Sequence, residues 1–171
     1  YYPNSDIGTE DRNNCYRSCH IDNEHTDMTG CSAFEQGGRV YRDNKKSSTC
    51  KCTQCSDNFY KTGDTCTPCP DPYPNSKAGQ NDTINKCYSE PTAKGKFIEY
   101  NNGKGEIKDC TVGSYCTGDT TVNYGSSGGI TKCLTPFLES DAGNSSENNC
   151  YRSCGASDIP NCNKITGRIT K

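Results

Sequence analysis

The chain has 171 residues, a formal net charge of −2 and 15 cysteines. Leu, Ile, Val and Phe together number only 18 (2, 9, 3 and 4) and there is no Trp, so apolar side chains are too few to fill a conventional globular core. The scattered Lys and Arg residues argue against nucleic-acid binding, and no apolar run is long enough for membrane insertion within this segment.

Disulfide bonds are a substitute for the missing core. A cross-link restricts the unfolded chain, and closing a loop of about 15 residues contributes ~3 kcal/mol in the chain-entropy model. Such bonds persist in oxidising compartments, so we expect an extracellular or cell-surface protein. The sequons that begin at Asn81 and Asn144 agree with this location and make both residues candidate glycosylation sites.

Three segments share one pattern, an aromatic residue followed six positions later by Gly and then by a Cys-Tyr pair. They begin at Tyr2, Tyr73 and Phe137, and their pairs are Cys15-Tyr16, Cys87-Tyr88 and Cys150-Tyr151. In addition, residues 13–19 recur unchanged as residues 148–154, with two cysteines in each copy. This identity establishes an internal repeat.

The repeat predicts two disulfides and one unpaired cysteine. Cys69 and Cys133 each lie four residues before the aromatic residue of their segment, which predicts the pairs Cys69–Cys87 and Cys133–Cys150. In the first copy the opening cysteine would precede Tyr1, so Cys15 has no partner within the chain. We favour a chain cut from a longer array, and joining of Cys15 to a neighbouring chain remains the alternative.

Ten of the fifteen cysteines remain once these five are set aside, and they are assigned from local spacing. The expected pairs are Cys19–Cys31, Cys154–Cys162 and Cys110–Cys116. Two further pairs come from Cys50, Cys52, Cys55 and Cys66, whose connectivity the sequence leaves open.

The repeat also suggests domain boundaries. Residues 1–19 are the end of a truncated repeat, residues 20–69 and 70–132 are cysteine-rich units, and residues 133–171 are a unit that is incomplete at its C-terminus. The last boundary follows because Gly167-Arg168-Ile169 repeats Gly38-Arg39-Val40, after which the first copy continues.

Strand signals are short and bounded by turn residues. We expect three hairpins, which pair residues 39–41 with 49–52, residues 58–60 with 65–66, and residues 96–100 with 105–108. No stretch has a helical apolar period, so helix should be negligible. The predicted fold class is small, disulfide-rich and mostly β or irregular, an elongated array of short two-stranded hairpin units stapled by disulfides.

Residues 50–150 contain a motif that is familiar from known receptors. Cys52-x-x-Cys55, then Asn58-Phe59-Tyr60-Lys61-x-Gly63-Asp64-x-Cys66-x-x-Cys69-Pro70 and Tyr73-x-x-Ser76-x-x-Gly79, resembles the cysteine-rich repeats of tumour-necrosis-factor-receptor-like and ephrin-receptor-like modules. Cys110-x-x-Gly113-Ser114-Tyr115-Cys116 looks like a variant unit of this kind. The resemblance implies a rod of disulfide-laddered modules outside a cell. The bias to Asn, Lys, Asp, Ser and Thr suggests a microbial surface repeat protein.

Two possible metal sites are weaker interpretations of these residues than disulfides and a solvated loop. Cys52, Cys55, Cys66 and Cys69 have the spacing of a four-thiolate zinc site, but the cysteines outside this pattern favour disulfides. His20 and His25 flank an acidic loop that can bind a metal, although solvated loop residues are the simpler interpretation. We therefore expect no metal, no cofactor and no catalytic residue.

The expected function is structural. Tyr16, Tyr88 and Tyr151 share one repeat position, so packing against each unit is their first interpretation and contact with a partner is the second. We expect a non-catalytic extracellular stalk or fibre whose main partner is itself, through neighbouring repeats or head-to-tail copies. The alternative is an adhesin or receptor-like module that recognises a surface protein or glycan.

Overall fold

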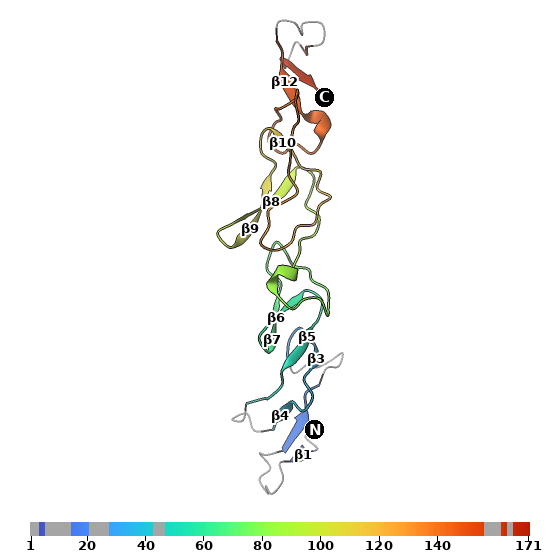
Figure 1. Cartoon of the computed structure of the whole chain (residues 1–171), viewed down its shortest axis with the longest axis vertical. Coiled ribbons are helices and arrows are strands. Elements are labelled where there is room, and N and C mark those ends of the chain that lie inside the picture. The colour runs from blue at the N-terminus through green and yellow to red at the C-terminus, as the bar shows by residue number, and fades with distance from the viewer. Residues whose placement is uncertain (1–3, 6–14, 21–27, 43–46, 156–161, 164–165) are drawn as a thin grey trace. The chain divides into compact units, whose positions relative to one another are not determined.

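The computed structural model (Figure 1) describes residues 4–5, 15–20, 28–42, 47–155, 162–163 and 166–171. The chain forms two compact units. Unit 1 comprises Tyr1–Pro70 and Pro74–Cys87, and unit 2 comprises Asp71–Tyr73 and Tyr88–Lys171. Seven disulfides and short antiparallel strands dominate both units, which confirms the predicted fold class. Among the described residues, no helix has the length and apolar character required to cross a membrane.

Unit 1 contains three small sheets, with strand orders β1-β2-β4, β3-β5 and β6-β7. The only helical element described in this unit is a single 3-10 turn, η2. The elements are β1 (Asn4–Ser5), β2 (Cys15–Ser18), β3 (Cys31–Phe34), β4 (Arg39–Tyr41), β5 (Cys52–Cys55), β6 (Phe59–Thr62), β7 (Thr65–Pro68) and η2 (Ile84–Lys86).

Unit 2 contains three two-stranded sheets, β8-β9, β10-β11 and β12-β13. Its longest strands form the β8–β9 hairpin, which turns at Asn102 (φ 51°) and Gly103 (φ 80°). The elements are β8 (Lys96–Asn101), β9 (Lys104–Asp109), β10 (Ser114–Tyr115), β11 (Thr131–Lys132), the 3-10 turn η3 (Glu147–Asn149), β12 (Tyr151–Ser153) and β13 (Arg168–Thr170).

Two of the three predicted hairpins are confirmed and one is wrong. β6 pairs with β7 and β8 pairs with β9, each across a turn that contains residues in the left-handed region. Residues 39–41, by contrast, pair with β2, while β5 pairs with β3. Residues 48 and 49 still contact Arg39, whose carbonyl accepts from the Thr49 amide (2.9 Å) and the Ser48 hydroxyl (3.2 Å) and whose amide donates to Thr49 Oγ1 (2.9 Å). The non-local pairing prevails because the β3–β5 sheet buries three cysteines.

The internal repeat is visible as a repeated hydrogen-bond register. In β2–β4, Tyr16 lies opposite Tyr41 and Ser18 opposite Arg39. In β12–β13, Tyr151 lies opposite Thr170 and Ser153 opposite Arg168. A third segment completes each copy, because Asn4 pairs with Tyr16 and Glu139 pairs with Tyr151. The boundary expected after residue 19 therefore falls inside one three-stranded sheet.

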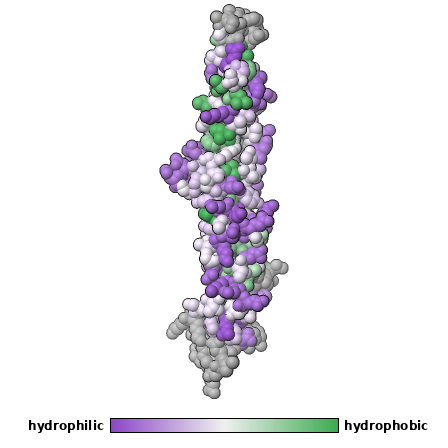
Figure 2. Space-filling view, in the orientation of Figure 1, coloured by the Kyte–Doolittle hydropathy of each residue, from purple (hydrophilic) through white to green (hydrophobic). Residues whose placement is uncertain are grey.

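Sulfur atoms provide most of the buried interior. The largest side chains that are less than 2% exposed are Tyr73, Ile98, Ser89 and six half-cystines, namely Cys52, Cys55, Cys87, Cys110, Cys116 and Cys150. Figure 2 shows only small, separate hydrophobic areas on the visible face. Disulfides thus take the place that aliphatic side chains hold in ordinary cores.

Candidate functional site

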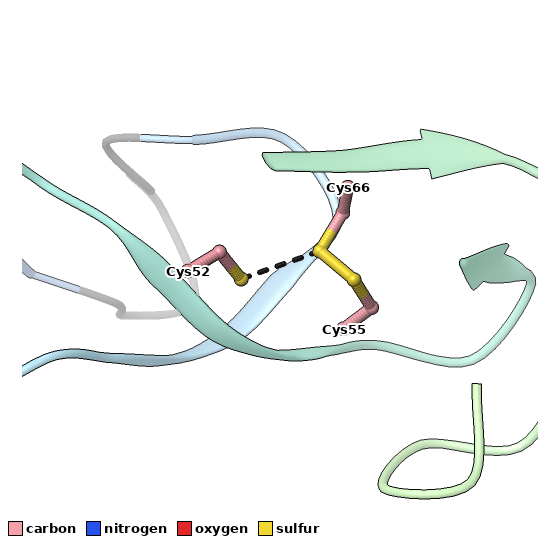
Figure 3. A group of neighbouring side chains, drawn as sticks. All are labelled: Cys52, Cys55 and Cys66. Carbon is pink, nitrogen blue, oxygen red and sulfur yellow. Dashed lines mark hydrogen bonds between the residues drawn. A yellow bond between two sulfur atoms is a disulfide. The ribbon is translucent and has the colours of Figure 1, made fainter. Parts of the chain in front are cut away.

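Among the described residues, three cysteine sulfurs in unit 1 lie close enough together to be considered as metal ligands. Cys31 is bonded to Cys52, and Cys55 is bonded to Cys66. The two bonds touch, since the Sγ atoms of Cys52 and Cys66 are 3.2 Å apart (Figure 3). Because both sulfurs are already disulfide-bonded, this contact is a packing contact without a hydrogen. Met28, Phe34 and Phe59 cover the cluster.

The observed connectivity corrects the sequence prediction around this cluster. Cys19 does not pair with Cys31; it pairs with Cys50, 31 positions along the chain. Cys50 and Cys52 therefore take partners outside the group of four that was expected to pair internally. Cys31 lies directly opposite Cys55 in the β3–β5 sheet. This sheet juxtaposes the cysteines of two strands that are distant in sequence, which local spacing does not reveal.

The zinc alternative also changes with the connectivity. The Sγ atoms of Cys52, Cys55 and Cys66 all lie within 4.8 Å of one another. The fourth expected ligand, Cys69, is bonded to Cys87 instead. Since a metal requires thiolates and these sulfurs are in disulfides, the cluster as it stands is a structural core.

The remaining pairs follow the repeat. Cys69 joins Cys87 and Cys133 joins Cys150, as the two equivalent segments predict. The short local pairs Cys110–Cys116 and Cys154–Cys162 are also present.

Among the residues that the structure describes, Cys15 is the one free cysteine. It begins β2 and is half-buried, whereas its repeat equivalents, Cys87 and Cys150, are both fully buried in disulfides. Its carbonyl accepts a hydrogen bond from the Arg42 amide (2.9 Å), and the Cys150 carbonyl accepts the same bond from Lys171 (3.0 Å). The backbone around Cys15 is therefore that of a disulfide-bonded repeat position, with a thiol in place of the bond.

The repeated tyrosines pack within their own units. The Arg39 guanidinium lies 4.2 Å from the ring centroid of Tyr16, and the Arg168 guanidinium lies 3.9 Å from that of Tyr151. Both are cation–π contacts between equivalent residues of the two copies. Tyr88 is half-buried and forms a bridge with Asn123. The packing interpretation thus accounts for the shared position.

A polar pocket of about 380 Å³ lies beside Tyr151 in unit 2. The Tyr151 hydroxyl donates to Asp141 Oδ1 (3.2 Å), and Arg168 donates to Asp141 Oδ2 (2.8 Å). The bond from Arg168 holds the pKa of Asp141 below its ordinary value, and burial raises the pKa of Tyr151. Asn144 and Asn149 also line this pocket. Its planar polar groups and one aromatic ring are suited to a hydroxylated ligand.

The two sequon asparagines are buried, and their glycosylation stays a prediction. Asn81 is 3% exposed, and its Nδ2 donates to the carbonyls of Cys55, Ser56 and Phe59 at 2.6–3.2 Å. Asn144 is 7% exposed. Their carbonyls accept equivalent bonds from Lys61 and Cys116, both 2.9 Å. Through these bonds each asparagine joins its loop to a preceding segment of the chain.

Some of these features lie beyond what sequence patterns signal. Asn81 and Asn144 both stand six residues before a repeat cysteine, and this shared position was the available clue to a structural role. The pairing of Cys31 with Cys52 has no such clue. His25 and the acidic loop around it lie outside the described residues, and His20 is exposed.

Comparison with known proteins adds no assignment. No protein-family model, no curated protein and no solved structure matches the chain. The resemblance to receptor-type cysteine-rich repeats therefore rests on the motifs of residues 50–150 alone.

Asn81 offers a test of the structural role. Asn81→Ala removes the buried amide and its hydrogen bonds to the Cys55, Ser56 and Phe59 carbonyls, so the free energy of unfolding should fall by about 1–3 kcal/mol. Thr83→Ala also destroys the sequon, but Thr83 is exposed and makes no side-chain capping bond to η2. Denaturant unfolding of the two variants should therefore differ. Equal losses, with a glycan on wild-type Asn81 by mass spectrometry, would refute the buried-amide role.

The Asp141–Arg168 pair predicts a pH dependence. Because the pKa of Asp141 is lower in the folded protein, the ion pair stabilises fully above the ordinary value near 4 and is lost as the pH falls through the lowered pKa. The protection factors of the β12–β13 amides, which correct for the intrinsic pH dependence of amide exchange, should fall over that range. Asp141→Asn should remove this part of the pH dependence, whereas an unchanged profile would contradict the role of the pair.

Proposed function

We propose that this chain is a non-catalytic, extracellular structural segment that forms part of a stalk or fibre and associates with copies of itself. The observation that carries the proposal is the recurrence of one sheet, with one register, at β1–β2–β4 and at Glu139–β12–β13. A module that recurs with its hydrogen bonds intact is the unit from which repeat arrays are built.

The energetics support a mechanical role. Seven disulfides divide the chain into loops of 6 to 31 positions, and each loop is held by a covalent bond that does not depend on a large shared core. Such units resist extension and local unfolding individually. Disulfides at this density also fit an oxidising extracellular environment.

Cys15 provides a point at which chains can join. In each of the two equivalent positions the cysteine is in a disulfide with the opening cysteine of its segment. The Cys15 thiols of two copies can form this bond, with loss of two hydrogens to an oxidant of the extracellular environment, and the product is a covalent dimer because the other fourteen cysteines are already paired within the chain.

The joining role is tested by native protein purified with rapid thiol blocking. Wild-type protein should migrate as a disulfide-linked dimer on non-reducing gels and as one monomer band after reduction. Cys15→Ser should give the monomer alone with an unchanged circular dichroism spectrum. A wild-type monomer whose Cys15 is quantitatively alkylated would overturn covalent joining.

A second candidate function, recognition of a surface glycan or protein, is favoured by the pocket beside Tyr151. Planar amides, a carboxylate and an aromatic ring are the groups that bind sugar hydroxyls and C–H faces. A glycan array probed with wild type and with Asn149→Ala, an exposed residue of the pocket, distinguishes the two functions. A ligand lost on this substitution would support recognition.

A further inference from the structure

β9 is the outer strand of a two-stranded ribbon (Figure 1). On the other side of the ribbon, β8 is partly covered, because Ile98 exchanges two backbone hydrogen bonds with Gly128 (3.0 and 2.9 Å). Ile98 also lies opposite Ile107. Since the polar groups of Ile98 point away from β9, the Ile98–Ile107 pair is not hydrogen-bonded, and Ile107 turns its own N–H and C=O outward.

Hydrogen-bonded and non-hydrogen-bonded pairs alternate along an antiparallel ladder, so every second residue of β9 has the same backbone orientation as Ile107. Gly105, Ile107 and Asp109 all direct their backbone groups away from β8. In the part of the chain that the structure describes, none of these groups has a hydrogen-bond partner. Gly105 is buried against Tyr73 and Pro72, so β9 presents an open edge at Ile107 and Asp109, with two donors and two acceptors.

The side chains of this edge are exposed and alternate in charge. Lys104, Glu106, Lys108 and Asp109 are all exposed, and Ile107 is 57% exposed although it is a large apolar residue. Lysine residues on an edge strand usually prevent pairing with other chains. β9 is a different case, because its order of positive and negative side chains is complementary to the same order run antiparallel. A second copy of the strand can therefore neutralise the charges.

We propose that β9 is an interface for a second copy of this chain, paired antiparallel about a two-fold axis at Ile107. In this register Ile107 faces the partner's Ile107 in a hydrogen-bonded pair. Glu106 then lies opposite the partner's Lys108, and Lys108 lies opposite the partner's Glu106. The interface is isologous, as expected for a closed symmetric dimer.

Hydrogen bonding and charge together select this register. Only registers that oppose outward-facing residues can form bonds, and three such symmetric registers are centred on residues 106, 107 and 108. A centre at Glu106 places Glu106 against itself and Lys104 against Lys108. A centre at Lys108 places Lys108 against itself. Of these three, only the centre at Ile107 joins opposite charges, which stabilise cross-strand pairs, whereas like charges destabilise them. A centre at Gly105 would also oppose Lys104 and Glu106, but it places the axis at a buried residue.

The contact is small. Two strands of this length bury less than the roughly 1,000 Å² of a stable interface, so the dimer is transient and reversible. Its charge pairs are exposed and weaken with salt. Where several copies are held in one array, the same contact would act many times and tie neighbouring arrays side by side. This lateral contact is independent of the Cys15 thiol.

The test uses charge reversal in full-length protein that carries Cys15→Ser, so that no covalent joining contributes. Sedimentation at high protein concentration and low salt should detect a reversible dimer of the parent protein. Glu106→Lys and Lys108→Glu each turn both attractive pairs into repulsive ones, and each should self-associate roughly tenfold more weakly. An equimolar mixture of the two variants should recover association, because each then faces its opposite.

Two controls keep the result interpretable. Ile107→Pro removes an outward N–H without touching a β8–β9 hydrogen bond and should abolish the dimer, while Ile107→Val should retain it. Lys108 also contacts Glu99 within the chain, so amide exchange of β8 must match the parent in every variant compared. A parent protein that stays monomeric, or a mixture that associates no better than either variant alone, would overturn the proposal.

Discussion

Covalent bonds between sulfur atoms are the constraint on which every other feature of this structure depends. The chain has too few aliphatic side chains to offset the conformational entropy of 171 residues. Six of its most deeply buried side chains are half-cystines, so the cross-links also serve as the interior against which Phe59, Phe97 and Ile130 pack. Short strands suffice because each pair is closed by a nearby bond.

This constraint also explains the buried polar groups. Loops closed by Cys69–Cys87 and Cys133–Cys150 carry few aliphatic side chains with which to dock. They are attached by hydrogen bonds instead, as when the Ser76 and Ser140 hydroxyls donate to the Phe59 and Ser114 carbonyls (both 2.7 Å). Asn81 extends the same solution in unit 1. Buried polar residues here determine how each loop docks, a role that shape complementarity has in larger cores.

The sequence was most informative where the chain repeats itself. Comparison of the copies located Cys69–Cys87 and Cys133–Cys150, and Asn102-Gly103 located the longest hairpin. Prediction failed where partners are distant and the copies differ. Cys19 pairs with Cys50 because β2 and β4 bring their flanks together, and no local spacing encodes that contact. The sequons did not reveal that Asn81 and Asn144 are buried, since a motif that marks an exposed acceptor also fits a buried amide.

The copies also suggest how a repeat can be varied without loss of its frame. Tyr16 with Arg39 and Tyr151 with Arg168 keep one stacked pair in one register, while the connecting segments differ in length and in cysteine pairing. Function is then free to reside in the variable parts, such as the β8–β9 ribbon and the pocket beside Tyr151.

The most direct test of this account is the intact mass of native protein, measured with and without reduction. Seven disulfides require the native mass to be about 14 Da below the reduced mass, because each bond removes two hydrogens. Full reduction should also abolish the native circular dichroism spectrum. A native mass equal to that of the fully reduced chain, or one raised by a bound metal ion that a chelator removes, would contradict the central role of the disulfides.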